Sequence, residues 1–139
     1  ERKLLLTKRV EKILRGKIKN KNITFLGVTF KPNTDDMRES SSLFMIPYLH
    51  KKGAKIKYFD PSGIKNEFNY LKNVNSCKNI YTACFKSDLI IIHTEWNEFK
   101  LINFKKIVKK NNFIVYDMRN IYTPSKMRKN GIKYFGIGR

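Results

Sequence analysis

The chain is poor in the residue types that build metal and disulfide sites. Its 139 residues include two Cys and two His, and only 11 Asp and Glu. Cys77 and Cys84 form no CxxC pair and have no histidines at metal-ligand spacing, which predicts reduced thiols and no bound metal. A disulfide between the two cysteines requires a fold that brings them together, which their spacing does not decide.

Long apolar runs are also absent. The longest strongly apolar run is Leu89–Ile92, far short of the roughly 20 residues that span a membrane. No secretory signal pattern is visible, so we expect a cytoplasmic protein without a membrane segment. Because the first residue is Glu1 and not methionine, we also expect the chain to be a piece of a longer protein.

The shortage of acids leaves a net charge of +19, which suggests nucleic acid as a partner. Two features weaken this interpretation. The lysines are scattered along the whole chain and stand beside asparagines, and arginine, the better reader of bases and phosphates, is much rarer than lysine. We therefore expect no specific nucleic-acid partner, and a basic nucleic-acid-binding α/β module remains an alternative.

Apolar patterning predicts alternating strands and helices within one core-forming unit. The expected strands are 23–28, 55–59, 88–93, 113–116 and 132–137. The expected helices are 4–14, 43–52, 81–85, 99–108 and 124–130, with 64–78 as a short helix plus loop. This order indicates a Rossmann-like α/β fold, a mostly parallel sheet of about five strands flanked by helices. We assign residues 1–21 to a helix end and linker, and 22–139 to the domain.

The expected helix 43–52 carries its own boundary signals. Gly53 stands in the position that commonly ends a helix, and a serine among residues 40–42 supplies a possible N-cap. Pro47 lies inside the pattern, where it should kink the axis or shift the start.

The most informative segment is the loop from Gly27 to Ser42, which follows the first strand. In a parallel sheet this loop shares one edge with the segments 94–96 and 117–120, where ligands bind. Together they bring three cations to one crevice, Lys31, Arg38 and Arg119, a set that suits a diphosphate. Gly27 has no second glycine nearby, so we expect side chains to hold the nucleotide, without a glycine-rich helix N-terminus.

Several residues at this edge also have purely structural interpretations. Asp35 or Asp36 either caps the helix or pairs with Arg38. We expect Trp96 to anchor its loop by packing, in preference to stacking on a ligand. We expect His93 to be a hydrogen-bonded structural histidine, in preference to a base. No catalytic arrangement is visible in the sequence.

The run Phe30–Ser40 resembles the start of the C-terminal, UDP-binding domain of the UDP-glucose/GDP-mannose dehydrogenase family. Further landmarks follow in the order of that family: 53–54, 58–61, 94–96 with Phe99, 117–120 and 134–139. The segment 33–38 looks most like the bacterial UDP-glucose 6-dehydrogenase branch. The resemblance covers nearly the whole chain, and it likens the first helix to the end of a long interdomain helix.

The resemblance implies an enzyme that oxidises UDP-glucose twice at C6, using NAD, to give UDP-glucuronate. The cysteine nucleophile of the family, which carries the thiohemiacetal and thioester, and the main NAD domain lie outside this sequence. Cys77 and Cys84 do not match the nucleophile motif, so no catalytic residue is assigned and this piece alone should be inactive. Family members usually form homodimers. GDP-mannose or a UDP-N-acetylhexosamine remains an alternative substrate.

The resemblance also implies roles for particular residues. Phe30 and Lys31 look like the pair that lines the UDP-sugar site, and Arg119 looks like the arginine near the uridine end. Arg38 looks like the arginine that reaches across the cleft to NAD. Asn120 and Met118 depart from the pattern, since some members carry arginine and glycine there, respectively.

Overall fold

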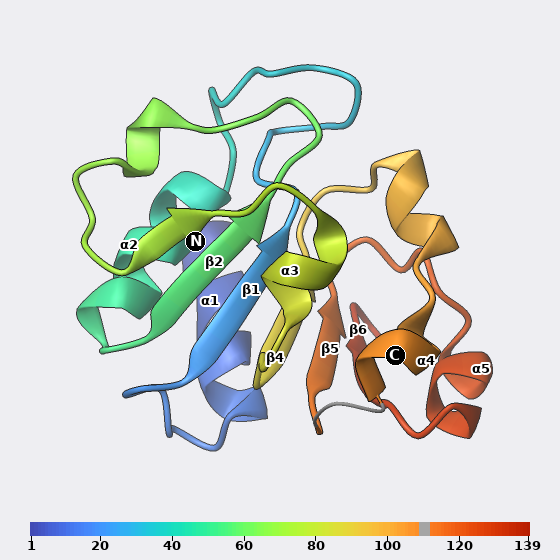
Figure 1. Ribbon diagram of the computed structural model, residues 1–139. Coiled ribbons are helices and arrows are strands. Elements are labelled where there is room, and N and C mark those ends of the chain that lie inside the picture. Colours follow the sequence, from blue (N-terminus) through green and yellow to red (C-terminus); the bar gives the residue numbers. More distant parts are fainter. Residues whose placement is uncertain (109–111) are drawn as a thin grey trace.

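One parallel sheet organises the chain in the computed structural model, which describes residues 1–108 and 112–139. Within these residues it has six strands in the order β3-β2-β1-β4-β5-β6 (Figure 1). The bounds are β1 Asn22–Leu26, β2 Lys55–Phe59, β3 Val74–Ser76, β4 Leu89–Ile92, β5 Ile114–Asp117 and β6 Lys133–Gly136. This is the strand order of a doubly wound sheet, so the Rossmann-like prediction is confirmed.

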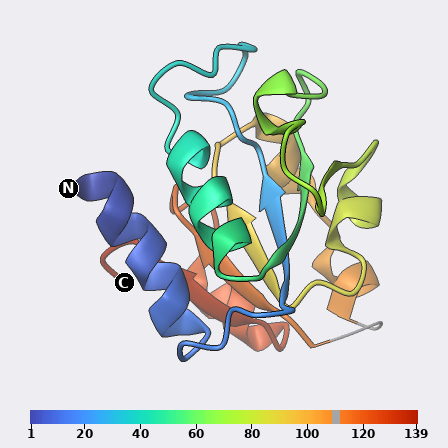
Figure 2. The same cartoon turned by 90° about the vertical axis from the view of Figure 1, so that its left-hand side faces the viewer.

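Helices cover both faces of the sheet (Figure 2). The α-helices are α1 Arg2–Ile13, α2 Ser42–Lys51, α3 Ile80–Cys84, α4 Phe104–Val108 and α5 Pro124–Lys129, with short 3-10 helices η1 Asn66–Phe68 and η2 Asn97–Leu101. Apolar residues of α1 and α2 share one core cluster, and those of α3, α4 and α5 share the other. The sheet therefore separates two cores.

The centre of the sheet is the most buried part of the chain. All four residues of β4 are buried, as its unbroken apolar run predicts for a strand covered on both faces. Phe25 of β1 pairs in register with Tyr58 of β2 on one side and Ile91 of β4 on the other.

The N-terminal helix belongs to the same packed unit. Val10, Ile13 and Leu14 join the core cluster that lies on the α2 side of the sheet. The hydroxyl of Tyr48 donates a 2.7 Å hydrogen bond to Glu11 Oε1, which links α2 to α1. Helix α1 thus lies directly against the sheet that carries the predicted site.

Two predicted segments differ from the structure. Residues 64–78 contain η1 and also the edge strand β3. Only Val74 of β3 is buried, so the strand has no apolar run by which the sequence could predict it. Residues 99–108 divide into η2 and α4 because Ile102 adopts an extended backbone with ψ 128°. Phe99 and Phe104 are buried from separate turns, which mimics the spacing of one helix.

Of the three boundary signals predicted for helix α2, the glycine at its end is confirmed, whereas the proline and the serine cap act differently from what was expected. Gly53 follows the helix with φ 99°, a left-handed conformation that favours glycine. Pro47 lies inside the helix, which still begins at Ser42. Ser41 holds the N-cap position, but its side chain makes no capping hydrogen bond.

Candidate functional site

The loop that leaves β1 is fixed at its base by one buried carboxylate. Asp60, directly after β2, accepts hydrogen bonds at Oδ2 from the backbone N–H groups of Val28 (2.7 Å) and Thr29 (3.2 Å). Its Oδ1 accepts from the N–H and the hydroxyl of Ser62. Because charge-assisted hydrogen bonds are strong, this carboxylate holds the loops after β1 and β2 together.

Three serines close the other end of the same loop. The hydroxyls of Ser40 and Ser42 each donate to the carbonyl of Val28 at 2.6 Å. Ser40 Oγ also accepts from the N–H of Ser42 (3.3 Å), while the hydroxyl of Ser41 turns to His93. Two of the serines predicted as helix caps, Ser40 and Ser42, therefore bind the start of α2 to the segment that follows β1.

The loop after β4 presses against the same segment. Thr94 Oγ1 donates to the carbonyl of Thr29 (2.8 Å), and Trp96 Nε1 donates to Thr29 Oγ1 (3.4 Å), which confirms Trp96 as an anchor of its loop. Gly27 has φ 78°, and a Cβ added there would lie 2.6 Å from Thr94 Cβ. Only glycine allows this approach.

This contact lies at the point where the strand order reverses, between β1 and β4. Doubly wound sheets commonly bind a dinucleotide in that crevice, on a helix that starts directly after the first strand. Here Gly27 and Thr94 lie so close that no Cβ fits between them, and the next helix starts only at Ser42. The geometry agrees with the absence of a glycine-rich turn.

His93 is fully buried beneath this edge and is held by two hydroxyls. Thr94 Oγ1 donates its own proton to Thr29, so it accepts from His93 Nδ1 (3.0 Å), which leaves Nε2 to accept from Ser41 (2.8 Å). Burial, with the nearby positive charge of Arg119, lowers the pKa of His93 to about 3. The imidazole is neutral at neutral pH, and the prediction of a structural histidine is confirmed.

Phe30 and Arg119 line one pocket beside this network. The pocket has a volume of about 270 Å³ and is closed on one side by the first turns of α1. Its lining residues are Glu1, Arg2, Lys3, Leu6, Phe30, Glu39, Ser41, Met118 and Arg119. Phe30 is 46% exposed, a large fraction for an aromatic ring. The pocket therefore places an available ring beside three cations and two acids, with Arg119 among the cations.

Arg119 is positioned by the strand ends. Its Nε donates to the carbonyl of His93 (2.8 Å), and its backbone N–H donates to Asp117 Oδ1 (3.1 Å). Glu95 Oε1 lies 3.9 Å from the same Nε. Among the residues described, none accepts a hydrogen bond from the two terminal guanidinium nitrogens. These nitrogens can serve a ligand.

The predicted convergence of three cations is seen only in part. Lys31 follows Phe30 and is exposed, but it does not line the pocket. Arg38 also lies outside it, and its guanidinium forms two hydrogen bonds to the Asp36 carboxylate (3.0 and 3.1 Å). This pair confirms one of the two roles expected for an aspartate here. Hydrogen bonds from Arg38 lower the pKa of Asp36.

Asn120 has a structural role that the sequence did not reveal. Its amide exchanges two 2.9 Å hydrogen bonds with the backbone of Ile137, from a left-handed conformation with φ 53°. The carbonyl of Asn120 also accepts from Arg139 (2.9 Å). Met118 is buried at the pocket wall. Asn120 therefore binds the C-terminal residues to the loop that carries Arg119.

The first turn of α1 was also missed as part of the site. Arg2 and Lys3 line the pocket from a helix that the sequence separates widely from Arg119. No local motif marks these residues, because their place depends on how α1 packs on the sheet.

Other candidate chemistries find little support in residues 1–108 and 112–139. No group of three His, Cys, Asp or Glu there could hold a metal ion, and no helix there has the length and apolarity to cross a membrane. Burial raises the pKa of both cysteine thiols, to about 12 for Cys84. Protonated thiols are poor nucleophiles.

Known proteins resemble this chain over nearly its whole length. UDP-glucose 6-dehydrogenase of Rhizobium meliloti (strain 1021) is 36% identical over 140 residues, which cover 99% of this chain and 32% of that protein. The Rickettsia felis enzyme of the same name is 38% identical, over 94% of this chain and 30% of its own length. A solved UDP-D-ManNAc dehydrogenase from Pyrococcus horikoshii superposes with a TM-score of 0.74 at 25% identity, covering 99% of this chain and 30% of that one.

The chain thus spans about a third of the length of the curated relatives it matches. The family model for the UDP binding domain of UDP-glucose/GDP-mannose dehydrogenases matches residues 24–124, from the first strand to the start of α5. With the sheet order and the pocket at its carboxyl edge, this match shows that the chain belongs to the UDP-glucose/GDP-mannose dehydrogenase family.

Proposed function

We propose that this chain is the nucleotide-sugar-binding part of an NAD-dependent UDP-glucose 6-dehydrogenase. The pocket shared by Phe30 and Arg119 carries this proposal. An exposed ring beside a fixed guanidinium suits a ligand that joins an apolar base or sugar face to a diphosphate. The identity of 36–38% to UDP-glucose 6-dehydrogenases supports the same ligand class.

Each side chain has a distinct task in this proposal. Arg119, held by the carbonyl of His93, presents its terminal nitrogens to the uridine end of the ligand. Phe30 supplies an apolar wall, and Lys31, exposed beside it, supplies a mobile charge for the diphosphate. These residues bind and orient the nucleotide sugar and move no proton.

Arg38 is the residue proposed to face NAD. Its side chain is 88% exposed and its hydrogen bonds go to one surface carboxylate, so it can exchange that partner for a phosphate at low cost. The donor set fits an anionic group held mainly by another part of the protein. When bound, NAD would accept the hydride from the sugar, whereas this chain supplies only binding groups.

The remaining proposals concern the whole protein. We expect two successive oxidations at C6 of UDP-glucose, a cytoplasmic location and a homodimer. Residues 1–21 would lead from the rest of the protein into the domain at 22–139. Without the nucleophilic cysteine and the main NAD domain, the present chain should be inactive.

A titration of this chain with UDP tests the binding role. We expect amide NMR shifts centred on Phe30, Met118 and Arg119, and similar shifts with UDP-glucose. Arg119→Gln should weaken UDP binding at least roughly tenfold, since a hydrogen bond from a charged donor, here to the uridine end of the ligand, contributes about 1.5–3 kcal/mol. Shifts confined to residues far from Phe30 and Arg119 would contradict the proposal.

Arg128→Gln is the matched control for charge. Arg128 is an exposed arginine of α5 whose guanidinium donates to the carbonyl of Tyr134, away from the pocket. This variant removes the same charge and should leave UDP affinity nearly unchanged. Equal binding of UDP and GDP would point to another nucleotide sugar. Competition by duplex DNA, with steep salt dependence, would favour the nucleic-acid alternative.

A further inference from the structure

A second hollow lies between α1 and β6. It has a volume of about 210 Å³ and is lined by Arg9, Lys12, Ile13, Arg15, Lys133 and Phe135. Four of these six residues are cations, and none is an acid. We call this hollow the α1–β6 groove. Cations make up a far larger share of its lining than of the chain.

The cations of the groove have no carboxylate partner among the described residues. The ion pairs found there join other residues: Lys8 to Glu11, Arg38 to Asp36 and Arg119 to Glu95. Glu11, the one acid within the turns of α1 that form the groove, faces α2 and accepts from Tyr48. The four like charges therefore repel one another without a counter-charge, and a bound anion would relieve that repulsion.

Arg9 gives the groove a fixed anchor. Its Nη2 donates to the carbonyl of Gly136 (3.3 Å), and its guanidinium carbon lies 5.7 Å from the centre of the buried Tyr116 ring. A guanidinium held on both sides loses little entropy when it binds an anion. The neighbouring Lys12 and Arg15 are exposed and can close over a ligand.

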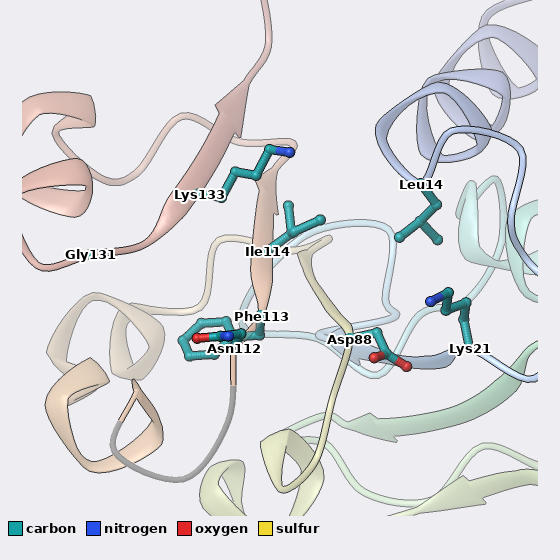
Figure 3. Close-up of a pocket in the computed structure, with 8 residues that line it drawn as sticks. All are labelled: Leu14, Lys21, Asp88, Asn112, Phe113, Ile114, Gly131 and Lys133. Atoms are coloured by element: carbon teal, nitrogen blue, oxygen red, sulfur yellow. The ribbon is translucent and has the colours of Figure 1, made fainter.

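A larger pocket, drawn in Figure 3, shares Lys133 with the groove. It measures about 360 Å³ and lies at the amino-terminal edge of β4, β5 and β6, opposite the pocket of Phe30. Leu14 and Ile114 lie between the amines of Lys133 and Lys21 in this view. The Asp88 carboxylate is already engaged by the N–H of Asn22 (2.8 Å). The lining therefore mixes apolar and cationic groups.

We infer that the α1–β6 groove binds an oligophosphate, either free or as the phosphate chain of a nucleotide. The groove is smaller than the roughly 300–1,000 Å³ of most small-molecule pockets, which suits a phosphate chain alone. An organic group attached to that chain would enter the neighbouring pocket at Lys133. This site is separate from the pocket of Phe30 and Arg119, because it uses the second half of α1. The inference of an oligophosphate site does not depend on the proposed function.

Binding of inorganic tripolyphosphate to the whole chain, at physiological salt, tests this inference. We expect amide shifts at Lys12, Arg15 and Lys133, and at least roughly tenfold weaker binding when these three become glutamine. Adenosine triphosphate should bind more tightly than tripolyphosphate if a nucleotide is the ligand, and no more tightly if the free oligophosphate is. Adenosine alone should not bind in either case.

A second triple variant, Lys51→Gln, Lys72→Gln and Lys78→Gln, controls for net charge. These lysines are exposed on other parts of the surface and the substitutions remove the same charge. The control should keep most of the affinity of the unmodified chain. Equal losses in the two triple variants, or shifts spread over the whole surface, would overturn the inference. Shifts centred on Phe30 and Arg119 would also overturn it.

Discussion

The base and the tip of the loop between β1 and α2 are built in opposite ways. At the base, Val28, Thr29 and Ser40 are buried, and their polar groups bond to Asp60, Thr94 and each other. At the tip, Asn33 and Asp35 are exposed, and the guanidinium of Arg38 donates to the nearby Asp36. One chain segment thus holds a rigid frame and a solvated end.

The difference follows from burial. A buried polar group without a partner costs about 1–3 kcal/mol, so the base must satisfy each of its groups and becomes locked. At the tip Met37 is buried and the carbonyl of Asp36 accepts from the N–H of Phe30 (3.1 Å), but the charged side chains lie in water and can change partners. Phe30 stands where the two meet, on a fixed backbone with an exposed ring. A binding loop built this way keeps its position while its outer charges adapt to a ligand.

The largest loss of stability is expected at Gly27, where the base of the loop packs closely against Thr94. Gly27→Ala should lower the free energy of unfolding by roughly 3 kcal/mol, from a left-handed backbone and a Cβ that overlaps Thr94. Urea denaturation measures this loss. Gly63→Ala is the control, because Gly63 also has positive φ (103°) but nothing lies within 4 Å of its added Cβ. Equal losses in both variants would show that the left-handed backbone alone causes the destabilisation. The overlap with Thr94 would then contribute nothing, and the base of the loop would have room for a Cβ.

The next effect concerns pH at the base. The unfolded chain binds a proton at His93 below about pH 6.5, whereas the folded chain, with the pKa of His93 lowered to about 3, does not. Stability should therefore fall as pH decreases from about 6.5 towards 3, by at most roughly 1.4 kcal/mol per pH unit from this group.

His93→Gln should flatten that pH dependence, even though it also weakens the fold at neutral pH by removing two hydrogen bonds. The readout is the slope of unfolding free energy against pH, measured by urea denaturation from pH 7 to pH 4.5. His50→Gln, at the other histidine of the chain, is the matched control. An unchanged slope in His93→Gln would show that the imidazole is protonated within the fold.

The sequence predicted the main strands and helices better than the individual contacts of the site. The apolar runs of β1 and β4 and the glycine after α2 placed these elements within a few residues. The edge rule for parallel sheets correctly brought the loop 27–42 and the segment 117–120 to one pocket, although Arg119 is the one of the three predicted cations that lines it. These predictions succeed because burial and backbone conformation act locally along the chain.

The features that the sequence analysis missed depend on contacts between residues far apart in the chain. Strand β3 has one buried residue and exists because it pairs with β2. Arg2 and Lys3 reach the pocket only because α1 packs on the sheet. The Asn120 link to Ile137 depends on two segments that meet at the end of β6. No spacing within the sequence encodes such contacts.

The smallest effect on stability is expected at the tip. Arg38→Gln removes the pair with Asp36, but both partners are solvent-exposed enough that the midpoint of urea unfolding should stay within error. The pKa of the Asp36 carboxyl should rise towards its ordinary value, because Arg38 is the main cause of its lowering. Carboxyl NMR titration measures this shift. UDP affinity should also stay unchanged, since Arg38 lies outside the pocket of Phe30 and Arg119. A loss of UDP affinity comparable to that of Arg119→Gln would mean that the tip folds over the nucleotide, and that the base and the tip act as one binding unit.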